Sequence, residues 1–224
     1  MANNEHAGHR KRMRKKFIEN GIDVFEPHET LEMLLFYAVP MKNTSILAHQ
    51  LINHFGSFSS VLDAPIDALI SFGLTETQAA YLKLMPETAR LYLDDKHNNP
   101  NKIITDENIN EYMINKFIGR IDENVLLLLL DAKNKELFCS VINKGSINAS
   151  QICVSKVVDL AMRYHARSAI IAHNHPSGIA LPSKQDIETT NAIKTALEVV
   201  GIKLLDHIIV ADNDCVSLAQ SELL

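Results

Sequence analysis

The sequence predicts a mixed α/β (α+β) fold in which an all-helical N-terminal domain precedes a domain of alternating strands and helices. Three observations support this division. Apolar side chains recur at helical spacing through the first 93 residues, residues 94–102 carry no apolar side chain, and short apolar runs typical of strands appear from residue 124 onward. We therefore expect a helical domain over residues 1–93, a linker over residues 94–102 and a second domain over residues 103–224.

The composition is that of a folded protein in a reducing compartment. The chain has 224 residues, of which 46% are hydrophobic and 22% charged, and its formal net charge is −5. The longest apolar run, residues 125–130, is too short to cross a membrane, and the polar, basic N-terminus lacks the apolar core of a signal peptide. Three widely separated cysteines predict neither a zinc cluster nor a set of disulfides. We expect a cytoplasmic protein without membrane contact.

The N-terminal domain is expected to contain helices bounded by polar caps and glycines. Gly21 and Gly56 are suited to end the first and third helices, and Asn43 or Thr44 to cap the third. A tight turn at Gly73 separates the last two. The expected helices cover residues 8–20, 27–38, 44–55, 62–74 and 75–85.

The C-terminal domain is expected to begin with a helix opened by Thr105 and then to alternate between strands and helices. The stretch "NVLLLLLDAKNKELFCSVIN" predicts a β-hairpin whose first strand, lacking polar alternation, is covered on both faces. The remaining elements are a helix over 150–166, a strand over 168–172, a helix over 183–200 and a strand over 203–212.

Candidate metal ligands gather in "AHNHPSGIALPSKQD", residues 172–186. His173 and His175 follow a strand, and side chains at i and i+2 of an extended chain point to the same side, so the imidazoles can converge. Ser183 is expected to cap the next helix, which puts Asp186 in its first turn, where the carboxylate can turn back toward the strand. Two neutral imidazoles and one carboxylate supply three ligands for zinc, whose fourth position then holds water. The turn between the strand and the following helix needs the conformational freedom of Gly178.

The H-x-H pair alone also suits a site without metal, in which His173 is hydrogen-bonded in the core and His175 lies in solvent. The complete spacing is more specific. The pattern H-x-H, seven residues, Ser, two residues, Asp resembles the JAMM motif of MPN-type zinc metalloproteases, a group that includes isopeptidases acting on ubiquitin-like conjugates. The stretches "AHNHPSG", "LLDHIIV", "LEMLLFYAVP" and "HFGSFSSVLDAP" resemble the RadC family, bacterial proteins labelled as DNA repair factors. This resemblance covers about residues 8–224 and is strongest over 171–210. It implies that residues 103–224 adopt the layered, cytidine deaminase-like MPN/JAMM fold and bind one zinc ion per chain through His173, His175 and Asp186.

Hydrolysis at such a site also needs a general base and an oxyanion donor. Zinc can lower the pKa of bound water to about 7, and a nearby glutamate is the usual proton acceptor. Glu123, just before the apolar run, is favoured because the resemblance places this glutamate near the start of a central strand. Glu136, which opens the second hairpin strand, is the alternative. Ser183 is suited to be the oxyanion donor if capping does not occupy its hydroxyl.

The residues near the predicted ligands have more ordinary explanations. Asp206 and His207 point to opposite faces of one strand, so we expect only one of them to be a hydrogen-bonded neighbour of the site. Asn174 faces away from the ligands and is expected to fix the loop through hydrogen bonds. No role in the site is expected for the remaining candidates, a solvated His165 and the core residues Cys153 and Cys215.

The N-terminal half contains a candidate nucleic-acid contact. Six Lys and Arg residues between residues 10 and 16 predict either a solvated helix face or a phosphate-contacting one. Residues 65–85 resemble a helix-hairpin-helix element, which binds the DNA backbone through amides of a glycine-rich hairpin. Here the hairpin is Gly73-Leu74-Thr75, without the usual second glycine. We expect a protein-interaction or weak DNA-binding domain.

Two function classes follow. The first is a zinc-dependent hydrolase of amide or isopeptide bonds that acts on an unknown protein or peptide. The alternative is a DNA-associated accessory protein with a structural or vestigial metal site, whose binding depends on Arg10, Lys11, Arg12 and Arg14. A ββα-metal nuclease is disfavoured because that signature distributes its histidines and asparagine over a hairpin and a helix.

Overall fold

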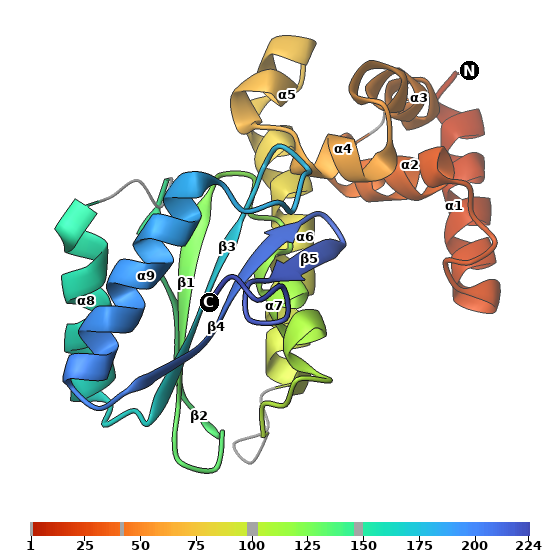
Figure 1. Ribbon diagram of the computed structural model, residues 1–224. Coiled ribbons are helices and arrows are strands. Elements are labelled where there is room, and N and C mark those ends of the chain that lie inside the picture. Colours follow the sequence, from red (N-terminus) through yellow and green to blue (C-terminus); the bar gives the residue numbers. More distant parts are fainter. Residues whose placement is uncertain (1, 41–42, 98–102, 146–149) are drawn as a thin grey trace. The chain divides into compact units, whose positions relative to one another are not determined.

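The computed structural model describes residues 2–40, 43–97, 103–145 and 150–224 (Figure 1). The chain forms two compact units, Met1–Ala89 and Arg90–Leu224. The boundary falls inside helix α6 (Glu76–His97), so residues 94–97 are helical where a linker was expected. Asp94 forms an ion pair of 2.9 Å with Lys116, which holds this polar helix end within the second unit. Residues 98–102, the rest of the expected linker, lie outside the described residues.

The first unit is helical, as the apolar spacing predicts. Asn43 caps α3, with its side chain accepting from the backbone N–H of Ser45, and Gly56 ends that helix. Ser57 caps a short helix over residues 58–63. The sequence predicted no separate helix there. The helices are α1 (Ala2–Asn20), α2 (Pro27–Ala38), α3 (Thr44–Phe55), α4 (Phe58–Asp63), α5 (Ile66–Phe72) and the first part of α6. Within the described residues, no helix has the length and apolar character needed to cross a membrane.

The second unit contains a five-stranded sheet with strand order β2-β1-β3-β4-β5. Strands β3 and β4 are parallel, and the other neighbours are antiparallel. Its elements are α7 (Ile109–Phe117), β1 (Asn124–Leu130), β2 (Glu136–Lys144), α8 (Ser150–Arg163), β3 (Ser168–Asn174), α9 (Lys184–Val199), β4 (Lys203–Ala211) and β5 (Asp214–Ser217). The four-residue strand β5 was not expected.

Helix α7 begins later than its sequence suggests. Asn108 precedes its first residue, and the side chain of Asn108 accepts the backbone N–H of Thr105 at 3.1 Å. The backbone oxygen of Thr105 accepts the N–H groups of Asn108 and Ile109 at 3.1 and 3.0 Å, so residues 105–108 form a turn that leads into the helix. The prediction that Thr105 opens the helix was therefore wrong by four residues.

Helices cover both faces of the sheet (Figure 1). Alternate side chains of β1 pack toward α8 and α9 on one face and toward α7 on the other, which confirms the expectation that this strand is buried on both faces. The first set comprises Val125, Leu127 and Leu129, and the second Leu126, Leu128 and Leu130.

The topology positions one end of β3 beside the start of α9. Because β3 and β4 are parallel, the chain must cross over between them, and α9 is that crossover. The crossover starts at the C-terminal end of β3, where the predicted ligand motif lies. A loop of nine residues, 175–183, joins the two elements and brings the first turn of α9 back toward the strand end.

Candidate metal centre

Three side chains from two elements converge at the C-terminal end of β3. His173 belongs to β3, His175 directly follows it, and Asp186 lies in the first turn of α9. Nε2 of His173 lies 2.8 Å from Nε2 of His175 and 3.4 Å from Oδ1 of Asp186. Nε2 of His175 lies 3.6 Å from Oδ2 of Asp186. The structure thus brings together the three residues that the sequence predicts as metal ligands.

The separations and the chemistry of these atoms suit a metal ion. Atoms bound tetrahedrally at about 2.0–2.1 Å from zinc lie about 3.3 Å from one another. The separations found here are 2.8, 3.4 and 3.6 Å, within about 0.5 Å of that value. His173 is 0% and Asp186 4% exposed, and a carboxylate buried to that degree needs a partner for its charge. This group could therefore hold a metal ion.

The ring of His175 is oriented by the loop that follows it. Its Nδ1 lies 2.9 Å from the backbone oxygen of Ile179, which can only accept, so Nδ1 carries the proton and Nε2 offers a lone pair to the metal group. The turn that returns Ile179 to His175 contains Gly178 with φ of 77°, a conformation that L side chains rarely adopt. The expected role of Gly178 in this turn is confirmed.

Asp186 is held by a capping box at the start of α9. Its backbone N–H donates to Oγ of Ser183 at 3.1 Å, and its Oδ2 accepts from both the backbone N–H and the hydroxyl of Ser183, each at 2.7 Å. Oδ1 remains directed toward His173. The hydroxyl proton of Ser183 is thus committed to Asp186, so the oxyanion role of Ser183 stays a prediction and requires this hydroxyl to turn away.

A chain of buried polar side chains lies behind His173. Nδ1 of His173 is 2.8 Å from Nε2 of His207, and Nδ1 of His207 is 2.5 Å from Oγ1 of Thr190. Thr190 in turn donates to the backbone oxygen of Asp186 at 2.5 Å. The expected hydrogen-bonded neighbour of the site is therefore His207. Thr190 was missed, although its spacing of four residues from Asp186 places both on one face of α9.

Burial favours the neutral form of both inner imidazoles. Desolvation lowers the pKa of His173 to about 4; the carboxylate of Asp186 opposes this shift, and His175 adds to it. Desolvation also lowers the pKa of His207 well below its ordinary value, helped by His173 and His175. Neutral imidazole is the form that binds a metal ion.

Asp206 lies on the other face of β4 and serves a different purpose. Its carboxylate accepts from the hydroxyl of Ser217 at 2.6 Å and from the backbone N–H groups of Ala219 and His207 at 3.0 and 2.7 Å. Burial raises the pKa of Asp206, partly offset by these bonds. Asp206 therefore ties the C-terminal segment to the sheet.

Asn174 lies between the two histidines and faces away from them. Its Oδ1 accepts the backbone N–H of Asn124 at 2.8 Å, and its Nδ2 donates to the backbone oxygens of Arg120 and Asp122 at 3.1 and 2.9 Å. Asn174 does fix a loop through hydrogen bonds, but that loop is the segment that leads into β1 and not the one that follows His175.

That segment carries Glu123, the favoured general base. Val125 lies opposite His173 in the antiparallel pair of β1 and β3. Residues two apart on an extended chain share a face, so the alternation of β1, continued to Glu123, puts this residue opposite His175 on the ligand face. The backbone oxygen of Glu123 accepts the N–H of Gly145 at 2.7 Å, which fixes the main chain there.

Glu136, the alternative base, lies at the other end of the sheet. It pairs with Leu130, which lies opposite Ser168 at the start of β3, five residues before His173. At about 3.3 Å per residue this is roughly 16 Å along the strand. Oε2 of Glu136 accepts the hydroxyl of Tyr112 at 2.5 Å on the α7 side. The structure does not bring Glu136 to the metal ligands.

Among the described residues, neither His165 nor Cys215 belongs to the candidate metal group. His165 is exposed in the turn after α8, and Cys215 is a half-buried free cysteine on β5. The side chain of Cys153 lies outside the described part of α8.

In the basic helix α1, two of the six cations contact its neighbours. Arg10 donates to the backbone oxygens of Phe36 and Val39 at 3.1 and 2.7 Å, which satisfies the C-terminal end of α2. Lys16 pairs with Glu29 at 3.2 Å. The cations that remain exposed on this helix are Lys11, Arg12, Arg14 and Lys15.

The hairpin between α5 and α6 satisfies its own amides. The N–H of Gly73 donates to Ile70 and that of Leu74 to Leu69, at 2.9 and 3.1 Å. The N–H of Thr75 donates to the side chain of Gln78 at 3.0 Å, and the N–H of Gln78 returns to the hydroxyl of Thr75 at 3.3 Å. Thr75 and Gln78 thus form a capping box, and these backbone N–H groups already have partners within the chain.

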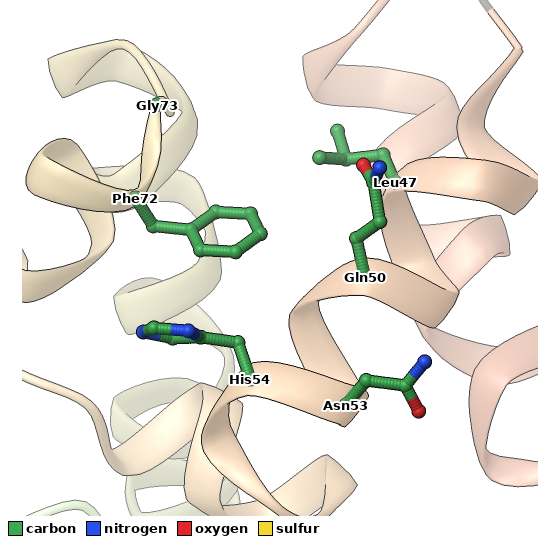
Figure 2. A pocket seen from close by; sticks show the side chains of 6 residues that line it. All are labelled: Leu47, Gln50, Asn53, His54, Phe72 and Gly73. Carbon is green, nitrogen blue, oxygen red and sulfur yellow. The ribbon is translucent and has the colours of Figure 1, made fainter.

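A separate hollow of about 560 Å³ lies in the helical unit, lined by Leu47, Gln50, Asn53, His54, Phe72 and Gly73. Figure 2 shows the ring of Phe72 directed toward Gln50 and Leu47, with the ring of His54 below it. The centroids of the two rings are 5.0 Å apart. With a single histidine and no carboxylate in its lining, this hollow lacks the ligand set found at the end of β3.

Comparison with known proteins identifies the family. Residues 103–223 match the model of the RadC-like JAB domain. The chain is 33% identical to a UPF0758 protein of Fusobacterium nucleatum, with both chains covered in full. A UPF0758 protein of Carboxydothermus hydrogenoformans is 32% identical over 95% of this chain and 94% of its own. One of Pseudomonas savastanoi is 32% identical over 96% of each.

The matched domain coincides with the sheet that carries the metal group. The helical part therefore precedes a JAB/MPN-like α/β domain, as the sequence predicts. With a domain match over more than half of its length and relatives along nearly all of it, the chain belongs to the RadC family.

Proposed function

We propose that the protein is a zinc-dependent hydrolase of amide or isopeptide bonds in a protein or peptide substrate. The observation that carries the proposal is the convergence of His173, His175 and Asp186 at one strand end. Three nitrogen and oxygen ligands leave a fourth tetrahedral position for solvent, as catalytic zinc sites do. Membership of a family with a JAB/MPN-like domain is compatible with this metallohydrolase chemistry.

The reaction needs a nucleophile, a base and a proton donor for the leaving group. Zinc held by the three ligands would lower the pKa of a coordinated water to about 7 and so supply a nucleophile at neutral pH. Glu123 takes the proton of the attacking water and then passes it to the leaving nitrogen. The water oxygen bonds to the carbonyl carbon, the C–N bond breaks, and the transferred proton completes the amine.

Solvent can reach the candidate metal group from the side of His175. The side chain of His175 is 19% exposed, whereas that of His173 is fully buried. In the loop between His175 and Ser183, the apolar side chains of Ile179 and Leu181 are 58% and 66% exposed. An extended polypeptide that reaches the metal group from this side would find apolar contacts next to it.

Substrate trapping with a matched control tests this proposal. Glu123→Gln removes the base and retains the metal ligands, while Glu136→Gln makes the same change at the far end of the sheet. Tagged proteins incubated with cell lysate should give a polypeptide retained by Glu123→Gln alone and released, cleaved, by wild type and Glu136→Gln. Equal retention by all three proteins, with intact zinc, would show that Glu123 is not the base.

The alternative function is DNA association through α1, and the exposure of Lys11, Arg12 and Arg14 supports it. Arg10 is excluded from this surface because it binds α2. Replacing the three exposed cations by Gln should abolish salt-sensitive DNA binding while metal content stays constant. Unchanged binding would exclude this role for α1.

A further inference from the structure

The hydrogen bonds in the polar chain behind His173 share one donor-to-acceptor direction, which is determined by the last acceptor in the chain. That acceptor is the backbone oxygen of Asp186, which has no proton to give. Because Oγ1 of Thr190 lies 2.5 Å from this oxygen, the single hydroxyl proton of Thr190 must lie between them. Oγ1 of Thr190 is then an acceptor toward the other partner, Nδ1 of His207.

The direction propagates through both imidazoles. Nδ1 of His207 must carry a proton to donate to Thr190, and a neutral ring then has a lone pair on Nε2. His207 is 1% exposed, and its two ring nitrogens contact Thr190 and His173. Nε2 of His207 therefore accepts a hydrogen bond from the Nδ1–H of His173. The remaining nitrogen, Nε2 of His173, is left with a lone pair toward His175 and Asp186.

We infer that His207 and Thr190 are positioning residues that set the tautomer of His173, so that its Nε2 is always presented as a lone pair to a metal ion. This inference rests on the metal site of the proposed function and adds residues to it. Both histidine ligands are then fixed by a backbone oxygen. His175 uses that of Ile179 directly, and His173 uses that of Asp186 through two side chains.

We call the hydrogen-bonded chain from His173 through His207 and Thr190 to the backbone oxygen of Asp186 the relay. The relay also couples the two elements that bear ligands. His173 lies on β3 and His207 on the parallel neighbour β4, where Ile171 pairs with His207. Thr190 lies on α9, one turn after the ligand Asp186. A change in Thr190 therefore alters metal binding without replacing a ligand side chain. Partners of this type in metal sites typically change metal affinity by about 10–100-fold when removed.

Substitutions in α9 test the relay. Thr190→Val keeps the side-chain shape but removes the hydroxyl, whereas Thr190→Ser retains it. Thr195→Val is the matched control, because Thr195 makes the same bond to the residue four positions earlier, 2.8 Å to the oxygen of Asn191, on the exposed side of the helix. We expect the zinc dissociation constant, measured by chelator competition, to rise about 10–100-fold in Thr190→Val and to stay near wild type in the other two.

NMR spectra of the metal-free protein test the relay independently of the proposed function. In metal-free protein labelled with ¹⁵N, long-range ¹H–¹⁵N spectra should show His173 and His207 both protonated at Nδ1, and Thr190→Val should lose this pattern at His173. A proton on Nε2 of either ring in wild type, or wild-type zinc affinity in Thr190→Val, would overturn the inference. Wild type that binds no zinc would instead refute the proposed function, and the metal-free spectra would still decide the relay.

Discussion

Oδ1 of Asn174 accepts the backbone N–H of Asn124 at 2.8 Å, a hydrogen bond between residues 50 positions apart in the chain. Asn174 stands between two candidate metal ligands, His173 and His175, and Asn124 follows the proposed base Glu123. One side chain therefore fixes the distance between the strand that holds the ligands and the segment that holds the base. The position between the two histidines thus has a structural task on the opposite face of β3.

Asn174→Ala should destabilise the second unit and leave the ligands in place. It removes three hydrogen bonds, to Asn124, Arg120 and Asp122, in a region where Asn174 is 6% exposed. Buried groups left without partners cost about 1–3 kcal/mol each, so we expect a loss of about 2–3 kcal/mol after partial relaxation. Urea unfolding measures this loss, and metal content should remain that of wild type. A loss below about 0.5 kcal/mol would show that the bonds are not needed.

Ser183→Ala should weaken metal binding as well as the helix. Loss of an N-cap costs about 1 kcal/mol, and Oδ2 of Asp186 also loses the hydroxyl that orients it. Ser57→Ala is the matched control, because Ser57 caps α4 by accepting the N–H of Ser60 at 3.0 Å in the other unit. Both variants should lose similar stability in urea. Only Ser183→Ala should bind zinc more weakly in chelator competition; equal zinc affinity in both would remove this role from Ser183.

The metal-free protein should lose stability as the pH falls below neutrality. The pKa of His173 is about 4 in the folded protein, against an ordinary value of 6.5, and that of His207 is also lowered. Between these values the unfolded chain binds protons that the folded chain does not, so the free energy of unfolding falls from pH 6.5 toward pH 4. Above pH 6.5 these two groups do not contribute to the pH dependence of the free energy of unfolding.

Urea unfolding in the presence of a chelator at about pH 7.5, 6.5 and 5.5 measures this dependence. A His173→Gln, His207→Gln double variant should give a shallower slope below pH 6.5, and His165→Gln, which changes an exposed ring, should not. An identical slope in the double variant and wild type would assign the effect to other groups.

The ligands could be predicted because local rules determine them. Alternation along an extended strand puts His173 and His175 on one side, and the serine cap of α9 puts Asp186 in its first turn. The helix boundaries of the first unit were similarly local, set by Asn43 and by glycines such as Gly56. The helix boundaries of the first unit and the candidate metal group both follow from short-range patterns of this kind.

What the sequence did not predict depends on pairing between distant elements. The register of β2, β1 and β3 puts Glu136 at the end of the sheet away from the ligands, and no local pattern states that register. Thr190 looks like any threonine of an amphipathic helix until β4 brings His207 beside it. Arg10 likewise belongs to a basic run, yet its partners are carbonyls at the end of another helix.

The metal content of the purified protein decides whether His173, His175 and Asp186 hold a zinc ion. Wild type, prepared without chelator and measured by mass spectrometry of its metals, should contain about one zinc per chain. A His28→Ala, His49→Ala variant, which removes a stacked histidine pair in the helical unit, should contain the same amount. A His173→Ala, His175→Ala variant should fall to background. Background metal in wild type, equal to that of the His173→Ala, His175→Ala variant even after exposure to zinc, would contradict the account.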